Sequence, residues 1–220
     1  MNFGFSDEQD AIRGTLARML SDHATLAVAH DCLDTAEGFD TATWAALADG
    51  GWLGLAIDEE AGGSAMGAVE LAILAEEIGR SLAAVPFAPV LGLATPAIQD
   101  MGTQSQKEEL LSGIAEGRMI VAAALAEDGG LAPERVSAKV VQDRLSGRKS
   151  PVSFAADASF ALVAAMDAGG TPRLYLVDLS DPSVSINALD AIDCTRPAAE
   201  IVFHNTPVEL LPGSDPAAIR

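Results

Sequence analysis

The sequence predicts an α+β fold, in which an all-α helical bundle domain is followed by an antiparallel β-barrel or sandwich domain. Two observations lead to this prediction. Helix caps and helical spacing of apolar residues fill the first half of the 220-residue chain, and short β-prone runs fill the second half. The change lies near Gly117. We therefore expect a helical domain over residues 1–118 and a β domain over residues 119–213.

In the first half, start signals precede most of the expected helices. A Ser at the N-cap with Gln or Glu three residues later satisfies two backbone N–H groups, and this pattern occurs twice. The region from about Ala65 to Gly79 is apolar nearly all round, so we expect this helix to be buried among others. The start signals of the other four helices are the Ser6/Gln9 pair, Asp40 with Thr41, Pro86 with Pro89, and the Ser105/Glu108 pair.

In the second half, strand-like runs alternate with turn signals. The runs are SAKVVQDRL, FALVAAM, RLYLVDL, SVSI and AEIVFHN, after a short apolar segment RMIVAAALAE. Gly147, Gly169-Gly170, Pro172 and Asp181-Pro182 separate them. Short strands at regular spacing are typical of an antiparallel sandwich or barrel.

The last residues, 214–220, have the pattern of a helix start. Asp215 followed by Pro216 is typical of an N-cap and first helical position. One turn cannot hold itself together, so we expect residues 214–220 to begin a C-terminal helical domain that this chain lacks. Ending at Arg220 would fit a trypsin-like cut, and a short natural terminus is the alternative.

Charge and cysteine content exclude several classes of protein. The formal net charge of −19 argues against contacts to nucleic acid phosphates and to an anionic membrane surface. Cys32 and Cys194 have no CxxC partner, so neither a disulfide framework nor a zinc site is expected, and we predict no metal. The N-terminus lacks a secretory signal pattern, and no apolar run is long enough for a membrane span. A cytoplasmic protein is expected.

Four segments resemble one known family. WAALADGGWLGLAIDEEAGGSAMGAVELAILAEEIGR, residues 44–80, is similar to the N-terminal region of the acyl-CoA dehydrogenase family. SDEQDAIRGTLARML resembles its first helix, VVQDRLSGRKSPVSFAADASFALVAA its G-x-K hairpin, and DCTRPAAEIVFHNTPV its closing strands. The resemblance covers essentially the whole chain and agrees with the expected order of helices and strands.

The resemblance implies a chemistry. The family holds FAD and oxidises the Cα–Cβ bond of an acyl-CoA thioester: a glutamate removes the α-proton, and the β-hydrogen leaves as hydride to the flavin. The substrate is expected between the helical and β domains, with the flavin edge against the β domain. That glutamate lies in the family's C-terminal domain, so we assign no catalytic residue here, and Glu76, Glu77 and Glu127 are not candidates.

The resemblance also implies which residues face the flavin. Where the family has Leu-Thr-Glu-Pro and a Gly-Ser-Asp turn, this chain has Leu125-Ala126-Glu127-Asp128, and Ala126 cannot donate a side-chain hydrogen bond. Backbone contacts from Leu125 and Ala126 are still expected. Where the family has Trp-Ile-Thr, this chain has Pro151-Val152-Ser153, and the Ser153 hydroxyl can replace that of Thr. The expected cofactor contacts are Leu125, Ala126, Val152 and Ser153.

For the other polar residues, we expect a role in the structure and not in binding or catalysis. Lys149 is expected to be a solvated hairpin residue. Arg196 is expected in an ion pair with one of the many acids, although it could bind an anionic group. The three histidines lack metal-ligand spacing.

Three functions stay open at this stage. The first is an acyl-CoA dehydrogenase-type flavoprotein of fatty acid or sterol catabolism, seen without its catalytic glutamate and expected to form a homodimer or homotetramer. The second is a non-catalytic partner subunit of a hetero-oligomeric acyl-CoA dehydrogenase, suggested by the altered segment from Ala126 to Gly130. The third is an acidic binding or scaffold domain that retains the fold. Straight, branched and steroid acyl groups are all compatible with the sequence.

Overall fold

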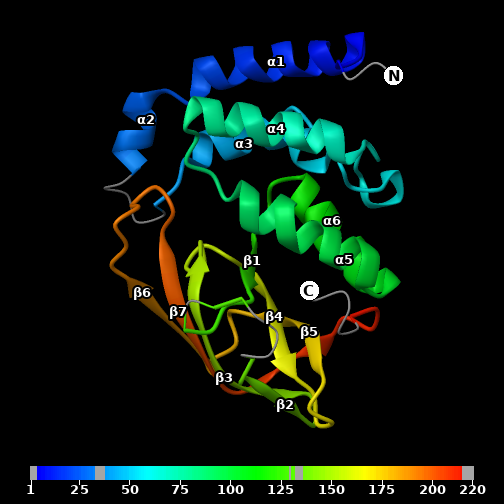
Figure 1. Cartoon of the computed structure of the whole chain (residues 1–220), viewed down its shortest axis with the longest axis vertical. Helices are drawn as coiled ribbons and strands as arrows, with labels where there is room; N and C mark the ends of the chain where they lie inside the picture. The colour runs from blue at the N-terminus through cyan, green and yellow to red at the C-terminus, as the bar shows by residue number, and fades with distance from the viewer. Residues whose placement is uncertain (1–3, 33–37, 129, 132–135, 215–220) are drawn as a thin grey trace.

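The computed structural model describes residues 4–32, 38–128, 130–131 and 136–214, and shows a helical layer covering a mixed β-sheet (Figure 1). The order of helices and then strands confirms the sequence prediction. The helical elements are α1 (Asp7–His23), α2 (Leu26–Asp31), α3 (Thr41–Asp49), η2 (Trp52–Gly54), η3 (Glu59–Ala61), α4 (Ala68–Ser81), η4 (Ala88–Ala94), α5 (Thr95–Met101) and α6 (Gln104–Ala115). The strands are β1 (Val121–Ala124), β2 (Lys139–Val141), β3 (Arg144–Ser153), β4 (Phe160–Met166), β5 (Pro172–Asp178), β6 (Val184–Leu189), β7 (Ala198–Pro207) and β8 (Glu209–Leu210).

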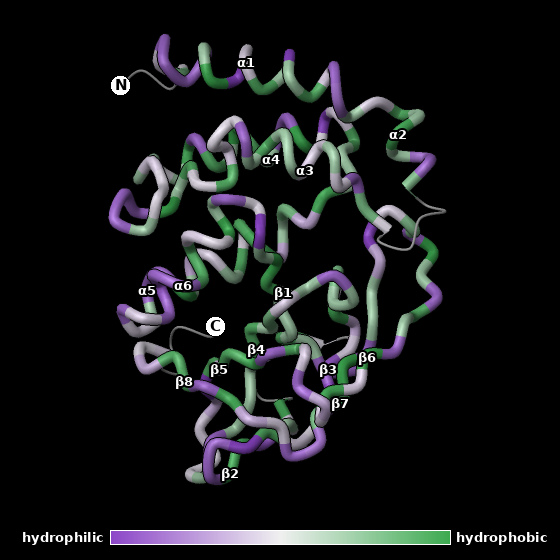
Figure 2. The backbone as a smooth tube through the Cα atoms, turned by 180° about the vertical axis from the view of Figure 1, so that it is seen from behind, coloured by the Kyte–Doolittle hydropathy of each residue, from purple (hydrophilic) through white to green (hydrophobic). Residues whose placement is uncertain are grey.

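The first helix starts where its cap predicts. Ser6 Oγ accepts a hydrogen bond from the Gln9 N–H at 3.2 Å, and Gln9 Oε1 accepts one from the Ser6 N–H at 3.0 Å. Hydrophilic and hydrophobic residues alternate along α1 (Figure 2), which packs one face on α4. The Asp40 cap of α3 is also confirmed, since its carboxylate accepts from the Thr43 N–H at 2.9 Å.

The predicted Ser105/Glu108 cap is wrong by two residues. The N-cap of α6 is Thr103, whose backbone is extended and whose side chain bonds the Gln106 N–H. Gln106 Oε1 accepts from the Thr103 N–H in return, at 2.9 Å. Ser105 already lies in the first turn of the helix. Two capping-box patterns overlap in this segment, and the helix uses the earlier one.

The segment between α3 and α4 is built on close backbone approach. Gly51 has a left-handed backbone, with φ at 74°, which allows the sharp turn after α3. A Cβ atom at Gly63 would lie 2.0 Å from the Ile57 carbonyl oxygen, so only glycine fits there. The acidic run between these glycines contributes Glu59 and Glu60 to the first turn of η3. This stretch therefore serves the close packing of the backbone in the helical half.

The buried face of α4 is narrower than predicted. Ile73, Leu74 and Ile78 are buried, but Val69 is 47% exposed. Glu77 is also buried, at 3% exposure, because it pairs with arginines from α1 and α4: Arg13 at 3.5 Å and Arg80 at 2.5 Å. The helix is thus covered on one face by the core and on another by an ion-pair cluster.

The strand pairing differs from the predicted antiparallel barrel. Its strand order is β6-β7-β3-β2-β4-β5-β8, with β1 also paired to β4. The β1–β4 and β2–β4 pairs are parallel, and the other pairs are antiparallel. Since β3 reverses the chain and β4 then pairs with β2 rather than β3, β2 and β4 run the same way. In the described part of the chain, β6 and β8 end the strand order without pairing with each other, so the sheet is not closed.

One hydrophobic core joins the helices to the sheet. It contains Leu47, Leu74 and Ile98 from the helices together with Leu162 and Leu176 from the strands. A second cluster of buried residues lies within the strand half. The predicted domain boundary at residue 118 falls between α6 and β1, and it stays a prediction because the two halves share a core. Residues 215–220 of the predicted third helical segment lie outside the described residues.

Candidate functional site

A buried ion pair anchors the loop that follows β1. Lys149 Nζ donates to Glu127 Oε1 at 2.6 Å, with side-chain exposures of 0% and 7%. The Glu127 carboxylate also accepts from the N–H groups of Ser137 and Ala138 at 2.8 and 3.1 Å, and from the Ser137 hydroxyl. One carboxylate therefore ties together the end of β1, the segment before β2, and β3.

The prediction that Lys149 is solvated is wrong. Along β3, the buried positions are Leu145, Lys149 and Val152, and irregular register steps separate them. Leu145 and Lys149 are four residues apart, so the period-2 alternation of a strand places both on the same buried face, and this alternation is broken only between Lys149 and Val152. The Lys149 ammonium tolerates full burial because the Glu127 carboxylate compensates its charge.

The environment of Glu127 keeps it ionised. Burial raises the pKa of this carboxyl group, but hydrogen bonds from Lys149, Ser137 and Ala138 outweigh burial, and its pKa lies below the ordinary value. Burial lowers the pKa of Lys149, against the opposing effect of Glu127. A carboxylate held in this way by donors is a structural anchor, not a proton acceptor for a substrate.

The structure brings the two expected flavin-facing segments together. The Ser150 N–H donates to the Ala126 carbonyl oxygen at 3.1 Å, so the loop after β1 lies beside the end of β3. Ala126 is buried and Leu125 is half-buried. Glu127 follows Ala126 and Lys149 precedes Ser150, so the buried ion pair adjoins this hydrogen bond.

Within these segments, only some groups are available to a ligand. The Val152 side chain is fully buried in the second hydrophobic cluster, which leaves only its backbone for contacts. Ser153 is half-buried and pairs with Ala198 in β7. Within the described residues its hydroxyl makes no hydrogen bond, so it can donate to a bound molecule.

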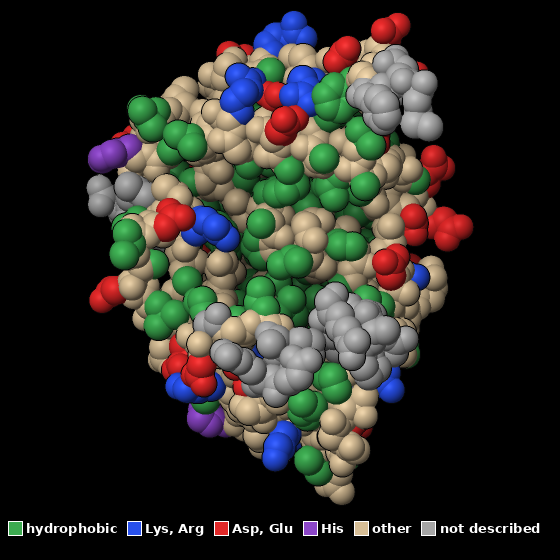
Figure 3. Space-filling model, viewed as in Figure 1, with side chains coloured by type: hydrophobic (Ala, Val, Ile, Leu, Met, Phe, Trp, Pro, Cys, Tyr) green, Lys and Arg blue, Asp and Glu red, His purple; other side chains and the backbone are tan. Residues whose placement is uncertain are grey.

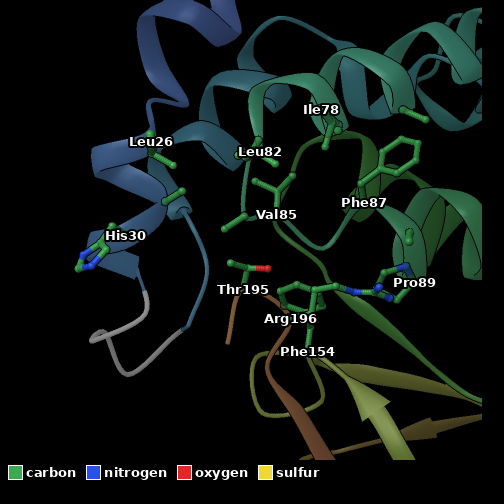
Figure 4. A pocket seen from close by; sticks show the side chains of 16 residues that line it. Leu26, His30, Ile78, Leu82, Val85, Phe87, Pro89, Phe154, Thr195 and Arg196 are labelled. Atoms are coloured by element: carbon green, nitrogen blue, oxygen red, sulfur yellow. The ribbon is translucent and has the colours of Figure 1, made fainter. Parts of the chain in front are cut away.

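A cavity of about 420 Å³ lies between the helical layer and the sheet, and Phe154, the residue after Ser153, forms part of its wall (Figure 4). Its wall includes Ile78 and Phe87 from the helical half and Phe154 from the sheet half. Phe154 packs edge to face on Phe39, with ring centroids 6.2 Å apart. Hydrophobic side chains gather across the middle of this face of the molecule (Figure 3). The volume is in the range of small-molecule sites, roughly 300–1,000 Å³.

Arg196 lines the same cavity, and its expected ion pair is not found. Within the part of the chain that the structure describes, no carboxylate lies within 4.0 Å of its guanidinium. Figure 4 shows the Arg196 side chain beneath Phe87, directed toward Pro89. The backbone beside Arg196 is held at the sheet, since the Phe154 N–H donates to the Pro197 carbonyl oxygen at 2.7 Å.

Two kinds of feature are absent from the described residues. They contain no group of three or more His, Cys, Asp or Glu side chains that could hold a metal ion. None of their helices combines the length and the apolar character needed to cross a membrane.

Comparison with known proteins identifies the family. The family model for the acyl-CoA dehydrogenase N-terminal domain matches residues 6–118. The chain belongs to the acyl-CoA dehydrogenase family. Its relatives include acyl-CoA dehydrogenase FadE28 of Mycobacterium tuberculosis, 36% identical over 126 residues, which are 57% of this chain and 37% of that protein. Mitochondrial isovaleryl-CoA dehydrogenase of Pongo abelii is 28% identical over 231 residues, covering 91% and 54% of the two chains.

Solved structures of the family share the fold. A variant of the steroid ACAD Tcur3481-Tcur3483 is 32% identical, with a TM-score of 0.85 over 97% of this chain and 58% of that chain. The ChsE4-ChsE5 complex from Mycobacterium tuberculosis is 23% identical, with a TM-score of 0.88 over 100% and 60%. The chain thus spans roughly half the length of the relatives that it matches.

The cofactor expectation agrees with these relatives. Fold neighbours include an acyl-CoA dehydrogenase from Bacillus anthracis in complex with FAD and a glutaryl-CoA dehydrogenase from Mycobacterium smegmatis in complex with FADH2. The groups at the expected flavin edge fit a flavin in part. Ser153 offers a hydroxyl without a protein partner, whereas Ala126 offers only its backbone. The sequence had not pointed to the Glu127–Lys149 anchor or to Phe154, although Lys149 belongs to the G-x-K segment that carried the resemblance.

Proposed function

We propose that this chain provides the N-terminal helical and middle β domains of an FAD-dependent oxidoreductase that dehydrogenates an acyl-CoA thioester between Cα and Cβ. One observation supports this most strongly: in a member of this family, a hydrogen bond between Ser150 and Ala126 brings the two expected flavin-facing segments together, and Phe154, which follows Ser153, lines an apolar cavity. The cavity would hold the acyl group, and the flavin edge would rest against residues 125–126 and 152–153. The steroid ACAD among the relatives favours a bulky acyl group.

The residues of this chain would bind and orient the flavin, and they would exclude water from the reacting carbon atoms. The backbone of Leu125 and Ala126 and the hydroxyl of Ser153 would hold the flavin edge by hydrogen bonds. The apolar walls formed by Phe87 and Phe154 would remove water from around the reacting carbon atoms, which strengthens electrostatic interactions there. When bound, FAD supplies the two-electron acceptor for the hydride from Cβ.

No described residue is proposed as the base for the α-proton. Glu127 is held by Lys149 and two backbone N–H groups, and Glu77 is paired with Arg13 and Arg80. We propose that the base is a glutamate of a C-terminal helical domain, as the family resemblance implies.

The test is anaerobic reduction of the flavin in the full-length protein. We expect the purified protein to show flavin absorbance, and an acyl-CoA thioester to bleach it without any other reductant. A protein that binds FAD but is not bleached by straight-chain, branched or steroid acyl-CoA thioesters would contradict the proposed reaction.

A second candidate is a non-catalytic subunit of a hetero-oligomeric acyl-CoA dehydrogenase. Ala126 favours it, since this position offers the flavin no side-chain donor. One of the related solved structures, ChsE4-ChsE5, is a complex. This candidate predicts that the protein purified alone lacks flavin and that a second family member restores it. The first candidate predicts a flavin-loaded homodimer or homotetramer, which mass measurement of the native assembly would distinguish.

A further inference from the structure

The apolar cavity contains a cation that the proposed dehydrogenation does not use. Arg196 reaches it from the loop before β7, and Ile78, Phe87 and Phe154 form its apolar wall. We propose that Arg196 binds a carboxylate carried by the acyl group, so that the preferred substrates are acyl thioesters with a second, distal carboxylate. This inference rests on the proposed function, because it assigns the cavity to the acyl group.

The charge of the cavity wall supports an anionic ligand group. The chain has 32 Asp and Glu residues against 13 Lys and Arg, yet the described residues that line this cavity include Arg196 and His30 and no acid. An arginine without an ion pair in so acidic a protein is available for a ligand. A guanidinium matches a carboxylate with two parallel hydrogen bonds, and this pairing is stronger than hydrogen bonds between neutral groups.

The position of Arg196 favours the acyl group over the phosphates of coenzyme A. Arg196 immediately precedes Pro197, whose carbonyl oxygen is bonded to the Phe154 N–H at 2.7 Å, and Phe154 follows Ser153. Arg196 therefore lies close to the point where the flavin and the reacting carbon atoms are expected. The pantetheine arm keeps the phosphates of coenzyme A far from the thioester. Arg196 is an exposed residue that lines the apolar cavity, so an anion that it binds within the cavity belongs to the acyl part.

A matched pair of thioesters tests the inference. Octanoyl-CoA and octanedioyl-CoA have the same chain length and differ in the terminal carboxylate. We expect calorimetric titration of the full-length protein to show tighter binding of octanedioyl-CoA, by about 10-fold or more, the usual effect of a charge-assisted hydrogen bond. Arg196→Gln should abolish this preference and leave octanoyl-CoA binding unchanged, whereas Arg196→Lys should retain part of it.

The control is Arg18→Gln, which removes the same charge from the exposed face of α1. It should leave both affinities as in the wild type. Equal binding of the two thioesters by the wild type, or no binding of either, would overturn the inference. The inference would also be overturned if Arg196→Gln weakened the binding of coenzyme A alone as much as the binding of octanedioyl-CoA, since Arg196 would then contact the phosphates.

The same samples separate this inference from the proposed function. Selective binding of octanedioyl-CoA without flavin reduction would contradict the proposed reaction and support the role of Arg196. Flavin reduction by both thioesters with equal affinity would support the reaction and overturn the role of Arg196.

Discussion

Two regions of this molecule resemble the acyl-CoA dehydrogenase family to different degrees. The segment from Trp44 to Arg80 keeps the family pattern of side chains, and its residues serve packing: Trp44 and Leu74 are buried, and Gly63 allows close backbone approach. The two segments expected to face the flavin, residues 125–128 and 151–153, depart from the family pattern in their side chains. They are nevertheless brought together by a hydrogen bond between Ser150 and Ala126 and by the adjoining Glu127–Lys149 ion pair.

The difference shows that the residues that hold the loop after β1 in position are not the residues expected to contact the flavin. The loop after β1 is held by the buried side chains of Glu127 and Lys149, and not by the groups expected to face the flavin. The loop can therefore lose a ligand contact, as at Ala126, without losing its position. We expect substitutions of the anchor to affect folding strongly, and substitutions of the ligand-facing groups to affect only binding.

The largest effect is expected at the buried ion pair. Lys149→Ala leaves the Glu127 carboxylate buried without its partner, and removing one member of a buried pair costs about 3–5 kcal/mol. Urea denaturation should show this loss in the free energy of unfolding. Lys139→Ala, at an exposed position of β2, is the control and should change stability by less than about 0.5 kcal/mol.

A double variant sharpens this prediction. Replacing both partners, with Glu127→Gln and Lys149→Met, removes the uncompensated charge and should recover most of the stability. A double variant as unstable as Lys149→Ala would contradict the importance of charge compensation and would indicate a packing defect.

A loss of similar or smaller size is expected in the packing region. Leu74 is fully buried in α4, so Leu74→Ala should lower the free energy of unfolding by about 2–5 kcal/mol. Val69→Ala in the same helix is the control, because Val69 is 47% exposed. Equal losses for the two variants would mean that the buried face of α4 is wrongly assigned.

The free energy of unfolding should depend on pH partly through the ionisation of Glu127. Its pKa is lower in the folded protein than the ordinary value of about 4.3, so the ionised form stabilises the fold above that value. This contribution is lost as pH falls below about 4.3 and through the folded-state pKa. Unfolding free energies between pH 3 and 7 should show the difference between wild type and Glu127→Gln shrinking toward low pH. A difference that is constant with pH would contradict the assignment.

The smallest effect is expected at Ser153. Ser153→Ala removes one neutral hydrogen bond to the flavin, which should weaken FAD binding about 2- to 10-fold and leave unfolding unchanged. Titration of the apoprotein with FAD, followed by flavin fluorescence, measures this. Ala126→Thr should have the opposite effect, since it introduces a hydroxyl beside the same edge. Unchanged FAD affinity in both variants would place the flavin elsewhere.

Local signals in the sequence were sufficient for much of the fold. The Ser6 and Asp40 caps act within three residues of their own position, so a short sequence window contains the whole interaction. The parallel pairing of β2 with β4 could not be found in this way, because it depends on which strand β4 selects as its neighbour. Burial of Lys149 was missed for a related reason, since its partner Glu127 lies 22 residues away in the sequence.

The flavin content of the full-length protein purified without any second family member tests the central claim most directly. Absorbance at the flavin bands, divided by protein concentration, gives the number of FAD molecules per chain. If the flavin-facing edge remains competent despite Ala126, we expect close to one FAD per chain. A flavin-free protein that gains FAD only when a second family member is added would contradict this claim and favour the partner-subunit function.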